Sequence, residues 1–496
     1  MKRVVKAFAL VTAVSAATRL MSFFFKIYLS RELGAEILGL YQIALSVLGL
    51  MSCVGSSGVP VTLSRLSAEN DALGRRRDSD ALTTLCLLAS GGAALALTLA
   101  SLAFPSVVER LFSDPRCVPV FYACLPMLMT TSVYATLRGR FWGERNYGVF
   151  AATELLDEIA KIVLSVLFIT ALGVTADAPV AYAYALVAGD VIVVAVLCVC
   201  YFASGAKASR PHGARKVLAS AAPLTAARLT GSAIGTLNSL MLPALLVSLC
   251  GLTTAEATAE FGRASGMVMP LLFTPSSLTG SLAVVLIPEL ASMSASGSRD
   301  AVERTSAMAV KFAAAVSAFF FVIFCACGVP IGTLLYHDAV AGKYLSAASA
   351  AMIPMCVNGI CASVLNSLGH EKATFAVGTV GALLLAALMA ALVGSCGIYA
   401  YFIAILVSHT LSLGAYLFLM HRHAGLTVET TLSVAALIAF GSLAALSLSQ
   451  LADALSALPT AAIVAAIGAA ALLLCAAFVG ATGIFTKRDI ESLLKK

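Results

Sequence analysis

Apolar segments of about twenty residues recur along almost the whole chain, separated by short polar loops. A helix rises about 1.5 Å per residue, so a segment of that length crosses the hydrocarbon core of a bilayer. Only 11% of the 496 residues are charged, and the mean hydropathy is +0.97. Soluble proteins carry about 25% charged residues, so lipid must solvate most of this chain. The sequence therefore predicts an all-α polytopic membrane protein.

Hydropathy and loop signals together predict about fourteen transmembrane helices. The expected spans are 8–30, 37–60, 82–104, 118–138, 150–172, 179–202, 216–249, 262–288, 306–328, 345–368, 373–394, 397–420, 428–449 and 459–482. The seventh is too long for a straight span, so it should be bent, tilted or partly outside the membrane. The N-terminal run carries Arg19 and Lys26 and has no convincing cleavage site, so we interpret it as a retained first helix.

The basic residues of the loops indicate the orientation. On these spans, 23 Lys and Arg residues lie on one side of the membrane and only 5 on the other. The five are Arg31, Arg110, Arg116, Arg263 and Lys343. The positive-inside rule then places both termini in the cytoplasm and predicts a multi-pass protein of the cell membrane. The net charge of +7 follows from this loop pattern, so it does not indicate nucleic-acid binding.

The 13 cysteines lie almost entirely within apolar runs, where a cysteine acts as a small apolar residue. They show no Cys/His spacing suited to a metal. We therefore expect no disulfide, no metal site and no bound cofactor. Neither a nucleophile elbow, an HExxH motif nor a phosphate-binding glycine loop is present, so no enzyme chemistry is predicted.

A weak internal repeat suggests two lobes. Residues 16–20 (AATRL) resemble residues 225–229 (TAARL), and the matches keep the same order along the chain. We expect an N-terminal lobe of six helices at 1–205 and a C-terminal lobe of six helices at 206–425. Two further helices and a basic cytoplasmic tail would occupy 426–496. A parallel repeat of this kind places the substrate between the lobes near the membrane midplane.

Four ionisable residues share one face of the predicted span 150–172. Glu154, Asp157, Glu158 and Lys161 follow the spacing i, i+3, i+4, i+7. A charge within the bilayer costs at least about 2.5–3.5 kcal/mol, so such residues usually face a water-filled cavity and mark a substrate or ion pathway. The bland alternative for Glu154 is solvation at the cytoplasmic interface.

Cationic stripes lie on the first and seventh predicted helices. Ser15, Arg19, Ser22 and Lys26 share one face, and Arg228 belongs to a similar polar stripe. Cations facing water at the midplane suit an anionic head group such as a pyrophosphate. The alternative is that these cations pair with carboxylates of neighbouring helices and only hold the bundle together.

Asp190 is a lone carboxylate in the middle of the predicted span 179–202, where it is a candidate proton or cation site.

Several motifs resemble the stage V sporulation protein B family, whose members are polysaccharide-export transporters of the multidrug/oligosaccharidyl-lipid/polysaccharide (MOP) superfamily. The resemblance lies in GLYQ at 39–42, GVPV at 58–61, LSRL at 63–66, RGRFWG at 138–143 and SGMVMPLLF at 265–273. It extends from about residue 5 to 420 and more loosely to the end.

The resemblance implies a MATE-like fold of fourteen helices in two lobes. It also implies a flippase for a lipid-linked oligosaccharide, such as a peptidoglycan precursor. By position, Arg19, Lys26 and Arg263 match the cavity cations that hold a pyrophosphate in related lipid II flippases. Asp157 and Lys161 fall where an acid and a base are expected. Asn238 stands where an Asp is expected, which argues against carboxylate-based ion coupling at that position.

We therefore predict a flippase with Arg19, Lys26, Arg228 and Arg263 as substrate-binding residues. Glu154, Asp157, Glu158, Lys161, Asp190 and Asn238 are candidate coupling residues. The driving force would be Na⁺, H⁺ or the membrane potential. The expected partners are the lipid-linked substrate, membrane lipid and cell-wall synthesis enzymes, with no nucleic acid.

Three alternatives stay open: a cation-coupled multidrug antiporter of the same superfamily, a multi-span membrane glycosyltransferase or ligase, and a non-transporting scaffold for cell-wall synthesis.

Overall fold

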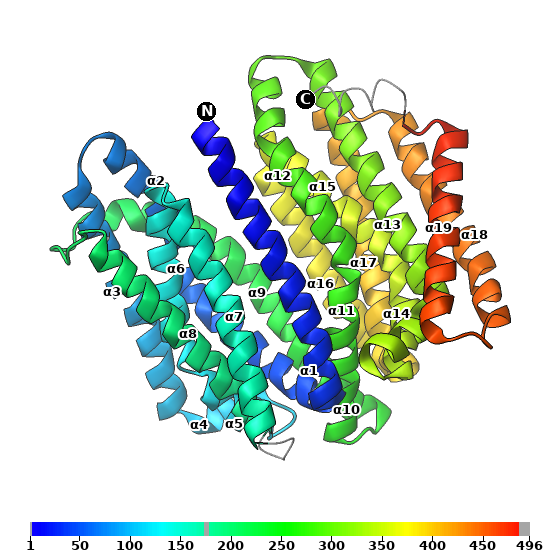
Figure 1. Cartoon of the computed structure of the whole chain (residues 1–496), viewed down its shortest axis with the longest axis horizontal. Coiled ribbons are helices and arrows are strands. Elements are labelled where there is room, and N and C mark those ends of the chain that lie inside the picture. The colour runs from blue at the N-terminus through cyan, green and yellow to red at the C-terminus, as the bar shows by residue number, and fades with distance from the viewer. Residues whose placement is uncertain (1, 173–177, 486–496) are drawn as a thin grey trace. The chain divides into compact units, whose positions relative to one another are not determined.

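The structure is a computed structural model that describes residues 2–172 and 178–485 (Figure 1). Across these residues the chain forms α-helices with one π-helical and one 3₁₀ segment, and it contains no β-strand. The predicted all-α class is confirmed. Contacts between residues divide the chain into two compact units, and each unit is described separately below.

Unit 1 comprises the residues up to Val247 together with Leu252–Gly262. Its helices are α1 (Lys2–Ser56), α2 (Val59–Ala72), α3 (Arg76–Ala103), α4 (Pro105–Leu111), α5 (Cys117–Cys124), α6 (Met127–Gly143), α7 (Tyr147–Leu172), α8 (Ala178–Ala203), most of α9 (Ala214–Cys250) and α10 (Thr254–Phe261). One buried cluster joins α6 to α8 through Leu137, Phe141, Val193 and Leu197.

Unit 2 comprises Ser248–Gly251 and the residues from Arg263 onward. It contains the π-helix Gly262–Val268 apart from its first residue, then α11 (Met269–Leu272), α12 (Thr274–Ala295), α13 (Arg299–Tyr336), α14 (Ala339–Ala348), the 3₁₀ turn Ser349–Ala351, α15 (Met352–Ser367), α16 (Glu371–Cys396), α17 (Tyr399–Ala424), α18 (Val428–Ala454) and α19 (Thr460–Thr482). Its core is formed mainly by α13, α15 and α17, with Val310, Val357 and Leu413 among the buried residues.

Each predicted span coincides with a helix, with part of α1, or with a helix interrupted by a short break. By length and composition, ten of the described helices could cross a membrane, or up to eleven if the bent pair α5–α6 forms one span. The prediction of about fourteen is therefore only approximately matched. One reason is that α1 continues through two predicted spans, with its kink at Gly34 (φ 75°). The charged helix α7 is not among the ten.

The contact-based units do not divide the chain at residue 205. Most of α9 belongs to unit 1, because Thr236 Oγ1 donates a hydrogen bond to the carbonyl of Ser46 at 2.7 Å and Thr225 accepts one from the Gly58 amide. The lobes at 1–205, 206–425 and 426–496 describe an internal repeat rather than contacts, and they stay a prediction.

Candidate functional site: a charged seam in unit 1

Lys161 lies between two carboxylates inside unit 1. Its Nζ is 3.0 Å from Asp157 on its own helix α7 and 2.8 Å from Asp190 on α8. Thr130 of α6 donates a hydrogen bond to the second oxygen of Asp190 at 3.2 Å. The structure thus joins Asp190, which the sequence left as a lone carboxylate, to the predicted stripe on α7. The pairing reduces the cost of these charges within the bilayer.

A cavity of about 160 Å³ adjoins this cluster. It is lined by Met127, Thr131 and Tyr134 of α6, by Lys161, and by Asp190 and Val194 of α8. Thr131, Tyr134, Lys161 and Asp190 place polar groups on its partly apolar wall, and its volume is large enough for several water molecules. The arrangement fits the expectation that ionisable groups at membrane depth face water.

Glu154 joins three helices one to two turns earlier on α7. Its Oε2 accepts a hydrogen bond from Arg138 of α6 at 2.9 Å. Its Oε1 accepts one from Ser15 of α1 at 3.0 Å and a longer one from Thr18 at 3.5 Å. The Arg138 guanidinium also stacks on Phe150, 3.8 Å from the ring centroid. Glu154 is therefore engaged by protein groups, not only by solvent.

Sequence reasoning missed the contribution of α6. The predicted span 118–138 ended at Arg138, whereas α6 continues to Gly143 and Arg138 Nη1 donates to the Tyr134 hydroxyl at 2.8 Å. Thr130, Tyr134 and Arg138 are spaced i, i+4, i+8 and so share one face. That spacing was the available signal, but a loop boundary drawn at residue 138 concealed it.

Arg19 and Lys26 have no hydrogen bond or ion pair to any described residue, and both side chains are exposed in the structure. Glu158, which is partly exposed, also forms no hydrogen bond or ion pair with a described residue. Arg19, Lys26 and Glu158 thus differ from Glu154, Asp157 and Lys161 of α7, each of which forms an ion pair.

Arg228 occupies a different environment. Its Nη1 donates to the carbonyl of Ser57 at 3.0 Å, where the chain breaks between α1 and α2. Thr225 accepts a hydrogen bond from the Gly58 amide at the same break. A Cβ at Gly58 would overlap the Ala221 carbonyl, so only glycine allows α9 to approach this closely. Arg228 thus satisfies a backbone carbonyl at a helix end.

Arg263 of unit 2 forms an ion pair with Asp338 at 2.8 Å. Asp338 also caps α14 by accepting hydrogen bonds from the amides of Val340 and Ala341. Burial alone would raise the pKa of Asp338, but the Arg263 hydrogen bond and these amides lower it. Asn238 of α9 is partly buried, and its Oδ1 has no hydrogen-bond partner within the described chain.

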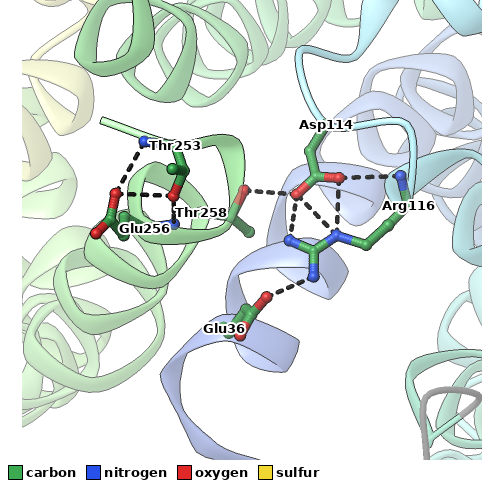
Figure 2. A network of polar contacts seen from close by, with 6 residues as sticks. All are labelled: Glu36, Asp114, Arg116, Thr253, Glu256 and Thr258. Atoms are coloured by element: carbon green, nitrogen blue, oxygen red, sulfur yellow. Dashed lines mark hydrogen bonds and ion pairs between the residues drawn. The ribbon is translucent and has the colours of Figure 1, made fainter. Parts of the chain in front are cut away.

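A second polar network joins α1 and α10 to the segment between α4 and α5 (Figure 2). Arg116 binds Asp114 through Nε and Nη2, at 3.0 and 2.7 Å, and also pairs with Glu36. Asp114 Oδ2 accepts a hydrogen bond from buried Thr258 of α10 at 3.1 Å. Burial opposes ionisation of Asp114, but hydrogen bonds and the charge of Arg116 outweigh it and lower the pKa of this carboxyl. Figure 2 also shows the Thr253–Glu256 capping box that begins α10.

The sequence matches the family model described as "Polysaccharide biosynthesis protein" over residues 4–294. The chain belongs to this family. The match covers unit 1 from residue 4 onward, including the charged residues of α1, α6, α7 and α8 described above.

Two relatives of this family member come from Bacillus subtilis (strain 168). Stage V sporulation protein B is 26% identical over 296 residues, which cover 56% of this chain and 56% of the relative. Sporulation protein YkvU is 23% identical over 299 residues, covering 58% of this chain and 66% of the relative. The matches span less than two thirds of either relative. They confirm the resemblance found in the sequence motifs.

Solved structures confirm the MATE/MOP-like fold over nearly the whole chain. The lipid II flippase MurJ in an inward closed conformation matches with a TM-score of 0.73 and 13% identity, covering 96% of this chain and 99% of that one. An inward-facing multidrug resistance MATE family transporter of the MOP superfamily matches with a TM-score of 0.69 and 14% identity, covering 85% and 95%.

Proposed function

We propose that this protein is a flippase that moves a lipid-linked oligosaccharide across the cell membrane. The substrate would carry a pyrophosphate between lipid and sugar, as a peptidoglycan precursor such as lipid II does. The head group would cross by alternating access while the lipid tail stays in the bilayer. Both termini would lie in the cytoplasm, as the distribution of basic residues indicates.

The observation that carries this proposal is that Arg19 and Lys26 form no ion pair with a described residue, whereas the neighbouring carboxylates Glu154 and Asp157 bind other cations. If Arg19 and Lys26 only held the bundle together, the carboxylates of α7 would be their natural partners. Arg138 already binds Glu154, and Lys161 already binds Asp157 and Asp190. Arg19 and Lys26 thus project without a described partner at membrane depth. Cations in that position favour an anionic ligand.

The same pairing bears on the cation-coupled antiporter alternative. A site for organic cations needs carboxylates that are open to the ligand. Here Arg138 binds Glu154, and Lys161 binds both Asp157 and Asp190. Of the four carboxylates on α7 and α8, only Glu158 has no cation bound to it among the described residues. We therefore assign Asp157, Lys161 and Asp190 to coupling, where proton or ion binding would compete with an internal ion pair. The family match and the MurJ-like fold support the flippase reading.

The test is flipping of labelled lipid II in proteoliposomes with an imposed cation gradient or membrane potential. Wild-type protein should expose the lipid to an external reagent, whereas Arg19→Ala and Lys26→Ala should lose this activity, because each removes a charge that holds the pyrophosphate. Arg110→Ala is the matched control, since Arg110 is an exposed arginine on α4 outside the seam.

Equal flipping by wild type, Arg19→Ala and Lys26→Ala would contradict the role of these cations. No lipid movement by any folded variant, combined with binding of cell-wall enzymes in a pull-down, would instead favour the scaffold alternative.

A further inference from the structure

The contacts of Glu154 fix how α1 lies against α7. Ser15 and Thr18 of α1 both reach the same carboxylate oxygen, and Arg138 holds the other oxygen. Ser15 and Glu154 are therefore level with each other where the two helices pack. The helices also run in the same direction, from the end that holds the N-terminus towards the end where α7 finishes (Figure 1).

One helical turn further along both helices, Arg19 follows Ser15 and Glu158 follows Glu154. Two parallel helices rise by the same amount over four residues, about 6 Å, so these residues are again level. Four residues rotate a side chain by about 40°, whereas the three-residue step to Asp157 rotates it by about 60° in the opposite direction. Asp157 turns towards Lys161 and α8, whereas Glu158 stays within about 40° of the direction in which Glu154 meets α1. Tyr182 of α8 is also close enough to Glu158 to interact with it electrostatically.

The ion pairs of α6, α7 and α8 also leave Arg19 and Glu158 without a partner among the described residues. Every other carboxylate of the α7 stripe is bound by a cation: Glu154 by Arg138 and Asp157 by Lys161. Asp190 shares Lys161. Among the described residues, Glu158 forms no hydrogen bond or ion pair, and neither does Arg19. The carboxylate of Glu158 on α7 and the guanidinium of Arg19 on α1 are thus both without a hydrogen bond or ion pair to a described residue.

We propose that Glu158 is an internal counter-anion for Arg19, which competes with the anionic head group of the substrate. This inference rests on the proposed function. When no head group is bound, a rotamer change lets the carboxylate take the guanidinium. An arriving pyrophosphate displaces it, and its return favours release on the other side. Glu158 therefore sets affinity and turnover, while Arg19 provides the binding charge.

Glu158→Gln should separate these two effects. The amide cannot compete for the guanidinium as a charge, so the anion binds more tightly and leaves more slowly. We expect the Kd for farnesyl pyrophosphate to fall about tenfold, measured by titration calorimetry on the purified protein in detergent. The rate of lipid II flipping should fall at the same time. Glu109→Gln removes an exposed carboxylate on α4 and is the matched control, with an unchanged Kd.

The double variant Arg19→Ala/Glu158→Gln tests whether Glu158 acts through Arg19. Its Kd should equal that of Arg19→Ala alone, because without the guanidinium there is nothing to compete for. An unchanged or weaker Kd for folded Glu158→Gln would overturn the proposal. So would an equal tightening with and without Arg19.

A charge exchange gives a readout that does not need the substrate. Arg19→Glu would place two acids level on adjacent helices and should lower the melting temperature, and adding Glu158→Arg should restore it. If Arg19→Ala leaves farnesyl pyrophosphate binding unchanged, the proposed role of Arg19 in binding the substrate is contradicted. The charge exchange still tests whether Arg19 and Glu158 interact. Failure of Glu158→Arg to restore stability would overturn the assignment of Glu158 even if flipping is confirmed.

Discussion

At the scale of single residues, the partner of each charge separates structural from binding roles. Arg228 and Arg19 occupy similar positions in a repeated sequence motif, yet Arg228 binds the Ser57 carbonyl, whereas Arg19 binds no described residue. The sequence could identify both as intramembrane cations. It could not distinguish them, because the distinction depends on a break in another helix.

Lys161→Met should destabilise the protein. The change leaves Asp157 and Asp190 partly buried without their shared cation, and removing one partner of a buried pair costs about 3–5 kcal/mol, less where solvent reaches it. The melting temperature in detergent should therefore fall. Asp190→Asn added to Lys161→Met should recover part of the loss, since it removes one of the two unpaired charges. No recovery would indicate that the loss comes from packing instead.

Asp114 should make the stability of unit 1 depend on pH in the acidic range. Its pKa is lowered in the folded state, so its contribution is present above the unfolded value of about 3.9 and is lost as the pH falls through the folded pKa. Asp114→Asn should be less stable than wild type at neutral pH and should lose less on acidification. Melting curves from about pH 6 to about pH 3 check this. A wild-type decline matched by Asp114→Asn would contradict it, and Glu109→Gln is the control.

At the scale of elements, glycines set how closely the helices of unit 1 approach. A Cβ on Gly39 of α1 would overlap the Thr258 carbonyl of α10, and one on Gly262 would overlap the Ala35 carbonyl. Gly34 supplies the positive φ that bends α1 just before this contact. The short helix α10 is thus held against α1 by backbone-to-backbone packing and by the Thr258–Asp114 hydrogen bond.

Gly39→Ala should therefore weaken the packing of α10 more than its small size suggests. The methyl group forces the two backbones apart, which costs about 1–3 kcal/mol in a well-packed interface. Hydrogen exchange at the amides of α10 should become faster. Gly49→Ala is a stringent control, because Gly49 lies on the same helix with no atom within 4 Å of the added Cβ. Alanine favours a helix more than glycine does, so propensity alone would not speed exchange. Equal acceleration by the two changes would contradict the contact with α10.

At the scale of the whole molecule, the matches to solved structures cover nearly the entire chain, while the family model covers residues 4–294. The loops that should face the cytoplasm carry most of the basic residues, so we expect charges outside the packed helices to set the orientation.

Reporter fusions would test this orientation. A fluorescent protein fused after Lys496 should be fluorescent, and alkaline phosphatase at the same position should be inactive, because the C-terminus is predicted to be cytoplasmic. The opposite pattern is expected for fusions after Asp338, in a loop predicted to lie outside. An active phosphatase at the C-terminus would contradict an even number of spans.

The sequence alone determined the all-α membrane class, the approximate spans and the face of α7 that carries four charges, because hydropathy and helical periodicity are local properties. The family match and the similarity to solved structures agree with the family resemblance of the sequence motifs. Only the tertiary structure decided the partners of those charges: Arg138 for Glu154, and Lys161 shared by Asp157 and Asp190. The Lys161–Asp157 pair lies within α7 at i, i+4, but the pairs of Glu154 and Asp190 join different helices. The spacing along one helix shows which residues share a face but not what that face meets.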